Sequence, residues 1–223
     1  MEAVLDQLRT AIEAGEYAVG AKLPSEATLA AEYGVSRPVV REALRALQAL
    51  GLTETLTGKG TFVTAAQATD NPRFGQYSAR DLLEVRQHVE VPAAGYAATR
   101  RSDDDLEAII GLVQRMEQEE DGTVWVALDS LFHIAVAHAS GNPVFGKVIE
   151  EIRDALAHQS AFVNQVGGRR AASNAEHRGI VDAIARGDGH AAETAMTAHL
   201  GHVDDTLVDI VAKKTNQATP RRS

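Results

Sequence analysis

The sequence contains no cysteine. This excludes disulfide bonds, cysteine-ligated zinc and thiol catalysis, and it is typical of a protein in a reducing cytoplasm. Long apolar runs are also missing, since no uninterrupted run approaches the roughly 20 residues that span a bilayer. The segment Met1 to Ala3 begins an amphipathic helix instead of a basic signal segment. The sequence therefore predicts a cytoplasmic protein with no membrane partner.

Positive charge is scarce, because the chain has 22 Lys and Arg residues and 31 Asp and Glu residues, so the formal net charge is −9. Taken alone, this charge disfavours a nucleic-acid partner, but one domain of a chain can carry such a contact. The stretch from Ser36 to Gly60 holds four basic and two acidic residues, so it is locally positive. The acidic runs at 103–105 and 117–121 are interpreted as solvated helix faces and a helix N-terminal turn.

Residues 1–65 have the layout of a winged helix-turn-helix. Apolar spacing predicts three helices, which end at Gly15, Gly34 and Gly51. Ser25 and Ser36 are predicted to cap the second and third helices. Two short runs rich in β-branched residues, 52–56 and 61–64, flank the turn at 57–60 and predict a hairpin, or wing.

The third helix carries the side chains that a recognition helix needs. Arg37 and Arg41 lie one turn apart at its N-terminal end, where such a helix meets base edges, and Arg45 continues the same face toward phosphates. Lys59 at the wing tip is placed to reach a phosphate or the minor groove. The alternative is a solvated basic face, but the surrounding layout favours binding to double-stranded DNA.

The chain after the wing predicts a second domain. Residues 66–77 lose all periodicity and contain a proline and a glycine, so they are interpreted as a linker. No strand signal appears after residue 65, and the helical patterns of residues 78–212 predict an all-helical antiparallel bundle. Its first helix is predicted to have Leu82, Val85 and Val89 on its buried face and a kink at Pro92. The polar tail at 213–223 is expected to fray. The predicted fold class is mainly α.

Asp129 and His133 form half of a metal site. They are four residues apart in a predicted amphipathic helix, so both side chains leave the face that also carries Trp125 and Phe132. Two polar groups that point into an apolar interior need a binding partner there.

His177 and His199 lie on the apolar faces of two further helices. One such histidine alone is usually a core residue, but three histidines and a carboxylate together indicate a metal site. His202 is the alternative metal ligand if His199 does not bind the metal, whereas His138 is predicted to lie on another surface of the helix. Neutral imidazoles and a carboxylate suit zinc, nickel, iron or manganese.

Arg86 lies between Leu82 and Val89 on an apolar face, where a guanidinium group needs an anion. Its fork suits the carboxylate of an effector. The alternative, given equal weight, is an internal salt bridge to Glu90, Asp129 or another acid.

Three motifs carry a resemblance to a known family. They are Leu23-Pro24-Ser25-Glu26, the run from Gly34 to Leu44, and Gly58-Lys59-Gly60-Thr61-Phe62-Val63. Residues 1–65 resemble the GntR family of bacterial transcription regulators. The resemblance implies that Arg37 and Arg41 read bases, that Ser36 and Pro38 flank them at the DNA surface, and that Gly58 to Thr61 form the wing.

Residues 78–212 are similar to the ligand-binding bundle of the FadR subfamily, the FCD type. The similarity rests on the segment 82–90, Asp129-x3-His133, the segment 139–143, Glu176-His177-Arg178 and the segment around His199. In metal-containing members the ligands fall on the positions of Asp129, His133, His177 and His199, and a small carboxylate effector completes the coordination.

Three functional hypotheses follow. The first is a homodimeric regulator, most often a repressor in this family, whose bound organic acid shifts its two recognition helices relative to a palindromic operator. The second is a metal-dependent hydrolase or lyase joined to a DNA-binding domain; its general base could only be Glu176, which lies off the face of His177. The third is a regulator in which the metal only braces the bundle.

Overall fold

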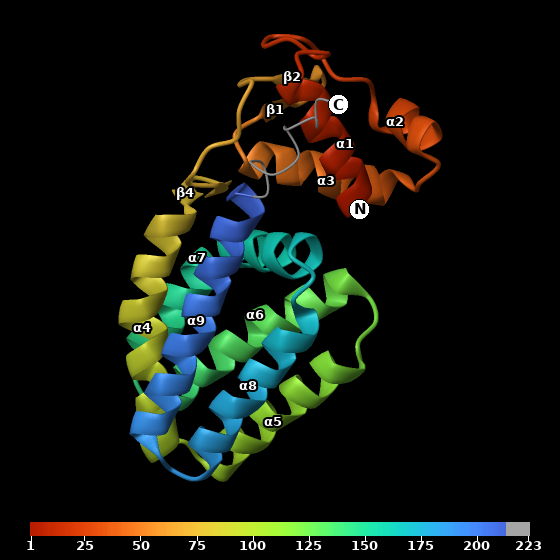
Figure 1. The fold of residues 1–223 in the computed structure, drawn as a ribbon. Coiled ribbons are helices and arrows are strands. Elements are labelled where there is room, and N and C mark those ends of the chain that lie inside the picture. Colours follow the sequence, from red (N-terminus) through yellow and green to blue (C-terminus); the bar gives the residue numbers. More distant parts are fainter. Residues whose placement is uncertain (213–223) are drawn as a thin grey trace, which may run out of the picture. The chain divides into compact units, whose positions relative to one another are not determined.

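The computed structural model describes residues 1–212, apart from the side chain of Gln165. The predicted tail at 213–223 lies outside the described residues. The chain divides into two compact units, Met1–Arg73 together with the segment from Val208 onward, and Phe74–Leu207. The predicted fold class is confirmed, since three helices and a hairpin precede a set of long helices (Figure 1).

The first unit is a winged helix-turn-helix. Its elements are α1 (Glu2–Glu13), α2 (Glu26–Tyr33), α3 (Arg37–Ala49), β1 (Thr53–Leu56) and β2 (Gly60–Val63). The side chain of Ser25 accepts the first-turn hydrogen bond of α2, and Gly34 ends that helix at a φ of 63°. The two strands pair antiparallel, with Thr53 opposite Val63.

Within the first unit, a buried arginine bonds the backbone of the segment that begins at Val208. Arg9 donates from Nη1 and Nη2 to the carbonyl oxygens of Ile210 and Val211, at 3.1 Å each, and its Nε lies 3.0 Å from Glu13. The last carbonyl groups of a helix have no partner within the helix. Arg9 supplies one, which explains why the segment from Val208 onward clusters with the first unit.

The second unit consists of a short β-ribbon and a helical bundle. Its elements are β3 (Arg73–Phe74), β4 (Tyr77–Ser78), α4 (Ala79–Arg100), α5 (Asp103–Gln118), α6 (Gly122–Ala139), α7 (Pro143–Ala161), the π-helical turn η1 (Phe162–Val166), α8 (Arg170–Ala185) and α9 (Gly189–Ala212). The expectation of no strand after residue 65 was wrong. Strands of two residues are too short to show the period-two pattern by which strands are recognised.

Helix α6 lies in the core of the bundle. Trp125 and Phe132 on α6 are fully buried, together with Ile109 of α5, Ile180 of α8 and Met196 of α9. By length and composition α6 could also cross a membrane, which the sequence analysis did not predict; half of its 18-residue window is buried inside the protein, as in a core helix.

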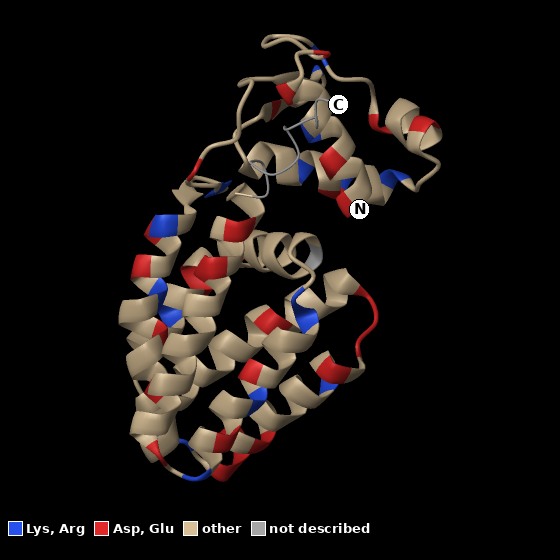
Figure 2. Ribbon diagram, in the orientation of Figure 1, with Lys and Arg blue, Asp and Glu red and all other residues tan. Residues whose placement is uncertain are grey.

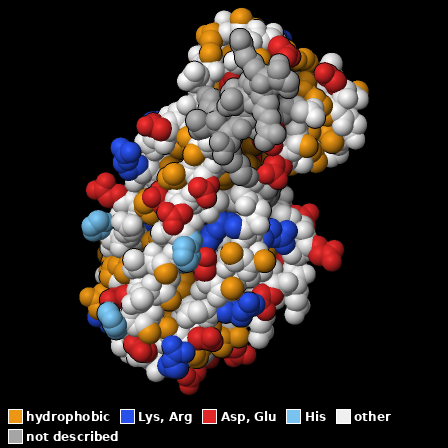
Figure 3. Space-filling model, in the orientation of Figure 1, with side chains coloured by type: hydrophobic (Ala, Val, Ile, Leu, Met, Phe, Trp, Pro, Cys, Tyr) orange, Lys and Arg blue, Asp and Glu red, His pale blue; other side chains and the backbone are white. Residues whose placement is uncertain are grey.

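Acidic residues mark the outer helices and the α5–α6 connection (Figure 2), and apolar side chains on the visible face alternate with charged ones (Figure 3).

Candidate functional site

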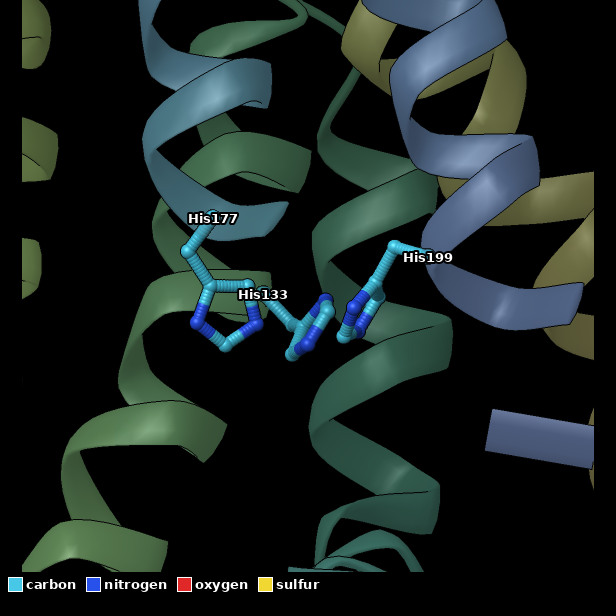
Figure 4. Close-up of side chains that lie close together, drawn as sticks. All are labelled: His133, His177 and His199. Atoms are coloured by element: carbon cyan, nitrogen blue, oxygen red, sulfur yellow. The ribbon is translucent and has the colours of Figure 1, made fainter. Parts of the chain in front are cut away.

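Three histidines from three helices meet in the interior of the bundle (Figure 4). His133 comes from α6, His177 from α8 and His199 from α9, and all three side chains are buried. One ring nitrogen from each lies within 4.8 Å of the other two. The structure therefore brings together the three histidines that the sequence analysis singled out.

Asp129 completes this cluster. Its Oδ1 lies 3.4 Å from His177 Nε2 and 3.9 Å from His133 Nε2. Its Oδ2 accepts a hydrogen bond of 2.6 Å from the hydroxyl of Ser160. One carboxylate oxygen is thus held by the protein, while the other faces the histidines.

His177 shows why the cluster fits a metal ion. The side chain is fully buried, and neither of its ring nitrogens has a hydrogen-bond partner. Its ring lies against Phe132, at 4.5 Å between centroids, and 6.4 Å from Trp125. Two buried polar atoms without partners cost free energy. A metal ion bound to one of these nitrogens removes part of that cost.

Burial also keeps these imidazoles in the state that a metal requires. Burial lowers the pKa of His177 well below its ordinary value, and the neighbouring His199 and His133 lower it further. Burial is the main reason that the pKa of His199 falls to about 4, against a raising effect of Glu176. Both rings are therefore neutral at pH 7, and a neutral imidazole is the form that coordinates a metal.

Glu176 lies behind His199 and not at the centre of the cluster. Its Oε2 is 2.8 Å from His199 Nδ1, its Oε1 is 2.9 Å from His202 Nδ1, and Arg169 Nη2 lies 2.6 Å from both oxygens. Burial would raise the pKa of Glu176, but the hydrogen bonds from His199 and Arg169 outweigh it and lower the pKa to about 2. Because both oxygens are engaged, Glu176 is poorly suited to act as a general base.

Arg86 forms the internal salt bridge that the sequence analysis kept as an alternative. Its Nε lies 2.6 Å from Glu90 Oε1, and its Nη2 lies 3.3 Å from Glu90 Oε2. Nη1 donates to Gln159 at 3.3 Å, and Nη2 is 3.3 Å from His133 Nε2. Burial would raise the pKa of Glu90, but the charges of Arg86 and His133 outweigh it and hold this pKa well below its usual range.

The buried face of α4 differs from the predicted one. Arg86 and Glu90 are buried, whereas Val85 is 37% exposed. Two opposite charges one turn apart can neutralise each other inside a bundle, which apolar periodicity does not reveal. Beside Arg86, Asp129 and His133 lies a cavity of about 10 Å³, about the room that one water molecule needs.

Sequence reasoning missed most of the residues around the ligands. Ser160, Asn164 and Ser173 were not considered, and Glu90 was named only as a possible partner of Arg86. A helical spacing of four separates Arg86 from Glu90 and Ser160 from Asn164, and this spacing is a signal that could have grouped them. His138 lies on another surface, as predicted, and its half-exposed ring is 2.9 Å from Glu150.

The predicted DNA-binding arginines are exposed on α3. The side chains of Arg37, Arg41 and Arg45 are 63%, 48% and 57% exposed. Arg41 donates from Nε and Nη2 to the two carboxylate oxygens of Glu26, at 3.0 and 2.9 Å, and Arg37 lies 3.7 Å from the same carboxylate. Glu26, which the sequence offered only as part of a family motif, therefore contacts two guanidinium groups at the start of the helix.

The remaining predicted DNA-surface residues differ in exposure. Ser36 and Pro38 are exposed. Ser36 is the N-cap residue of α3, as predicted, although its side chain makes no cap hydrogen bond. Gly58 and Lys59 are exposed in the turn between β1 and β2, whereas Thr61 is buried and its hydroxyl pairs with that of Thr55 at 3.0 Å.

Comparison with known proteins assigns both parts of the chain. Residues 1–63 match the family "Bacterial regulatory proteins, gntR family", and residues 81–202 match the FCD domain. The regulator LutR of Bacillus subtilis is 34% identical over 88% of this chain and 95% of its own length. The Exu regulon transcriptional regulator of Escherichia coli K12 is 33% identical over 86% of this chain and 78% of its own.

Solved structures share the fold. A GntR-family regulator from Pseudomonas syringae aligns with a TM-score of 0.53 and 25% identity, over 92% of this chain and 83% of its own. The metal-free FCD domain of TM0439 aligns with a TM-score of 0.50 and 24% identity, over 60% of this chain and 94% of its own.

The similar proteins are named as transcription regulators and not as enzymes. The hydrolase and lyase hypothesis is therefore wrong, in agreement with the engaged oxygens of Glu176. The chain belongs to the GntR family of transcription regulators, with an N-terminal DNA-binding domain followed by an FCD domain.

Proposed function

We propose that this regulator binds a divalent metal ion through Asp129, His133, His177 and His199, and that a small carboxylate held beside the metal changes its affinity for DNA. The observation that carries the metal is the buried His177 ring, whose two nitrogens have no partner. FCD domains are known to bind metal. A ligand set without thiolates suits zinc first, and also nickel, manganese or iron.

Arg86 is the cation best placed to receive the effector. Its Nε is occupied by a short contact with Glu90, but the contacts of Nη1 to Gln159 and of Nη2 to His133 are long, at 3.3 Å. A His133 Nε2 that coordinates a metal cannot also accept a hydrogen bond from Arg86. The outer edge of the guanidinium would then be free to bind a carboxylate.

The proposed output is repression by a homodimer on a palindromic operator in the cytoplasm. A relative from Citrobacter rodentium, 30% identical over 92% of this chain and 84% of its own, is named a transcriptional repressor. Two copies of α3 would read two half-sites of the operator. The effector can shift this equilibrium only by its difference in affinity between the two arrangements of the dimer.

A second candidate is a metal that only braces the bundle. The observation in its favour is that four protein side chains are enough for a closed tetrahedral shell. A thermal-shift screen of small carboxylates on the metal-loaded protein separates the two, because a ligand that binds the folded state raises its unfolding temperature. DNA binding that responds to chelation but to no acid would favour the bracing metal.

Arg86→Lys is expected to weaken the response to acid effectors while metal content is retained. Lysine keeps a positive charge near Glu90 but loses the planar fork that binds a carboxylate with two hydrogen bonds. We expect the effector concentration for half-maximal thermal shift to rise by about tenfold, the loss of roughly one charge-assisted hydrogen bond.

Arg153→Lys is the matched control, because Arg153 lines the same cavity but is 65% exposed. Equal effector responses in the wild type, Arg86→Lys and Arg153→Lys would remove Arg86 from the effector site.

A further inference from the structure

Two of the histidines carry a carboxylate at the ring nitrogen that points away from the cluster, and an arginine holds each carboxylate. The two sets are Arg169–Glu176–His199 and Arg86–Glu90–His133. They come from different helices and share no residue. The repetition of one arrangement at two ligands suggests a common task.

The first set is the more complete. His199 Nδ1 and Glu176 Oε2 are hydrogen-bonded at 2.8 Å, and Arg169, which is 8% exposed in its side chain, lies 2.6 Å from the carboxylate. Arg169 also donates to the hydroxyl of Ser173 at 3.0 Å. Glu176 is thus fixed from one side and bonds His199 from the other.

The second set has the same order on α4 and α6. Glu90 is 1% exposed, is paired with Arg86 at 2.6 Å, and lies 2.7 Å from His133 Nδ1. His133 Nδ1 and Glu90 Oε2 are close enough for a hydrogen bond but are not aligned for one. A rotation of the imidazole about its bond to Cβ would align them.

A carboxylate at Nδ1 decides what the other ring nitrogen can do. A neutral imidazole carries one proton, and a carboxylate acceptor holds that proton on Nδ1. The lone pair is then on Nε2, and the carboxylate makes that nitrogen more basic. In both sets, Nε2 is the nitrogen left for a metal.

We propose that Glu176 and Glu90 are positioning residues of the metal site, which fix the tautomer and the ring orientation of His199 and His133, and that Arg169 and Arg86 hold them in place. This proposal rests on the metal site proposed above. It gives Arg86 a second task, because Arg86 both pairs with Glu90 and lines the cavity beside Asp129 and His133.

A separate chain of hydrogen bonds leads from Asp129, the carboxylate ligand, to Arg169 of the first set. Ser160 donates to Asp129 Oδ2, Asn164 Nδ2 donates to the carbonyl oxygen of Ser160 at 3.0 Å, and the hydroxyl of Ser173 donates to Asn164 Oδ1 at 2.6 Å. Asn164 lies in the π-helical turn η1, and such turns are frequent at functional sites. Arg169 therefore supports both Asp129 and His199.

His177 differs from the other two histidines. Neither of its nitrogens has a hydrogen-bond partner, although Asp129 Oδ1 lies 3.4 Å from Nε2, and its ring packs against aromatic side chains. No carboxylate fixes its tautomer in the described residues. The proposal therefore assigns orientation by carboxylates to His133 and His199 alone.

The test is the zinc affinity of the full-length protein, measured on metal-stripped samples by competition with a chromophoric chelator. Glu176→Gln keeps the shape of the side chain and removes its charge. We expect the zinc affinity to fall by about 10- to 100-fold, the usual cost of losing such a partner. Glu117→Gln is the matched control, since Glu117 pairs with Arg178 of α8 away from the cluster, and we expect no change in it.

A buried Arg86 without Glu90 would destabilise the bundle, so the second set is tested by the double variant Arg86→Gln with Glu90→Gln, compared with the Glu117→Gln control. We expect the double variant to lose about 10- to 100-fold in zinc affinity and Glu117→Gln to keep the wild-type value; an unchanged zinc affinity in the folded double variant would remove Glu90 from the proposal. Circular dichroism at the assay temperature selects the samples that are folded.

A spectroscopic measurement separates positioning from a merely structural role. In the zinc-loaded protein, two-bond 1H–15N correlation of the imidazoles should show His199 and His133 protonated on Nδ1, with a changed Nδ1–H signal for His199 in Glu176→Gln. Zinc affinity of a folded Glu176→Gln within about twofold of the wild type, or protonation on Nε2, would overturn the proposal. A wild type that binds no zinc would instead overturn the metal site itself.

Discussion

Arg41→Ala is expected to reduce operator binding more than any other single change in the first unit. Arg41 is exposed at the N-terminal end of α3, and Glu26 already holds its guanidinium fork in a defined orientation. Loss of an arginine that contacts a base with two hydrogen bonds lowers affinity by about 5- to 140-fold. In a dimer both half-sites lose the contact, so specific binding should approach the nonspecific level.

The measurement is a gel-shift titration on DNA that the wild-type protein selects from a random pool. Arg45→Ala is expected to weaken binding to all sequences and to reduce the salt dependence, as loss of a phosphate contact does. Arg115→Ala, an exposed change on α5 of the bundle, is the control for charge. Unchanged affinity of Arg41→Ala would refute the assignment of α3 as the recognition helix.

His177→Gln is expected to abolish metal binding at micromolar metal concentrations. His177 contributes a nitrogen whose place no other described side chain can take, since His202 is directed to Glu176 and its ring is 56% exposed. Removal of a residue that only hydrogen-bonds a metal ligand lowers metal affinity by about 10- to 100-fold. Removal of the ligand itself should lower the metal affinity further. Elemental analysis after gel filtration measures the metal content directly.

The same variant should lose the stabilisation that metal gives. At a free metal concentration of about 100 times Kd, binding adds about 2.7 kcal/mol to the free energy of unfolding. A chelator should therefore lower the unfolding temperature of the wild type and leave that of His177→Gln unchanged. His138→Gln, on the same helix as His133 but paired with Glu150, is the control. Full metal occupancy in His177→Gln would refute the site.

The fold could be predicted from local signals. Helix boundaries followed from caps and glycines, such as Ser25, whose side chain caps α2, and Gly34, which ends that helix. The wing followed from two short runs around a turn. These signals act within a few residues, so they are visible in a sequence. The ribbon of β3 and β4 escaped notice because its strands hold two residues each.

The ligand histidines could also be found, because each lies on an apolar helix face whose period fixes its direction. The sequence by itself determined that the side chains of Asp129, His133, His177 and His199 point into the bundle, and thus that they could meet. The partners of these residues depend on which helices are neighbours and on their axial offset. Contacts between Glu176 and His199, or between Glu90 and His133, join residues 23 and 43 positions apart, and no local pattern encodes such pairs.

Arg86 also shows the difference between what the sequence determines and what the packing of the helices decides. Its position on an apolar face showed that it needs an anion, and by sequence an internal acid and an effector had equal weight; the structure shows Glu90 at 2.6 Å, and the effector role stays a proposal. A buried charge can be neutralised by any nearby opposite charge, and the low local dielectric strengthens whichever pair forms. The sequence determined that Arg86 must be paired, and the four-residue spacing within α4 offered Glu90; only the packing of α4 against α6 and α7 added His133 and Gln159 as partners.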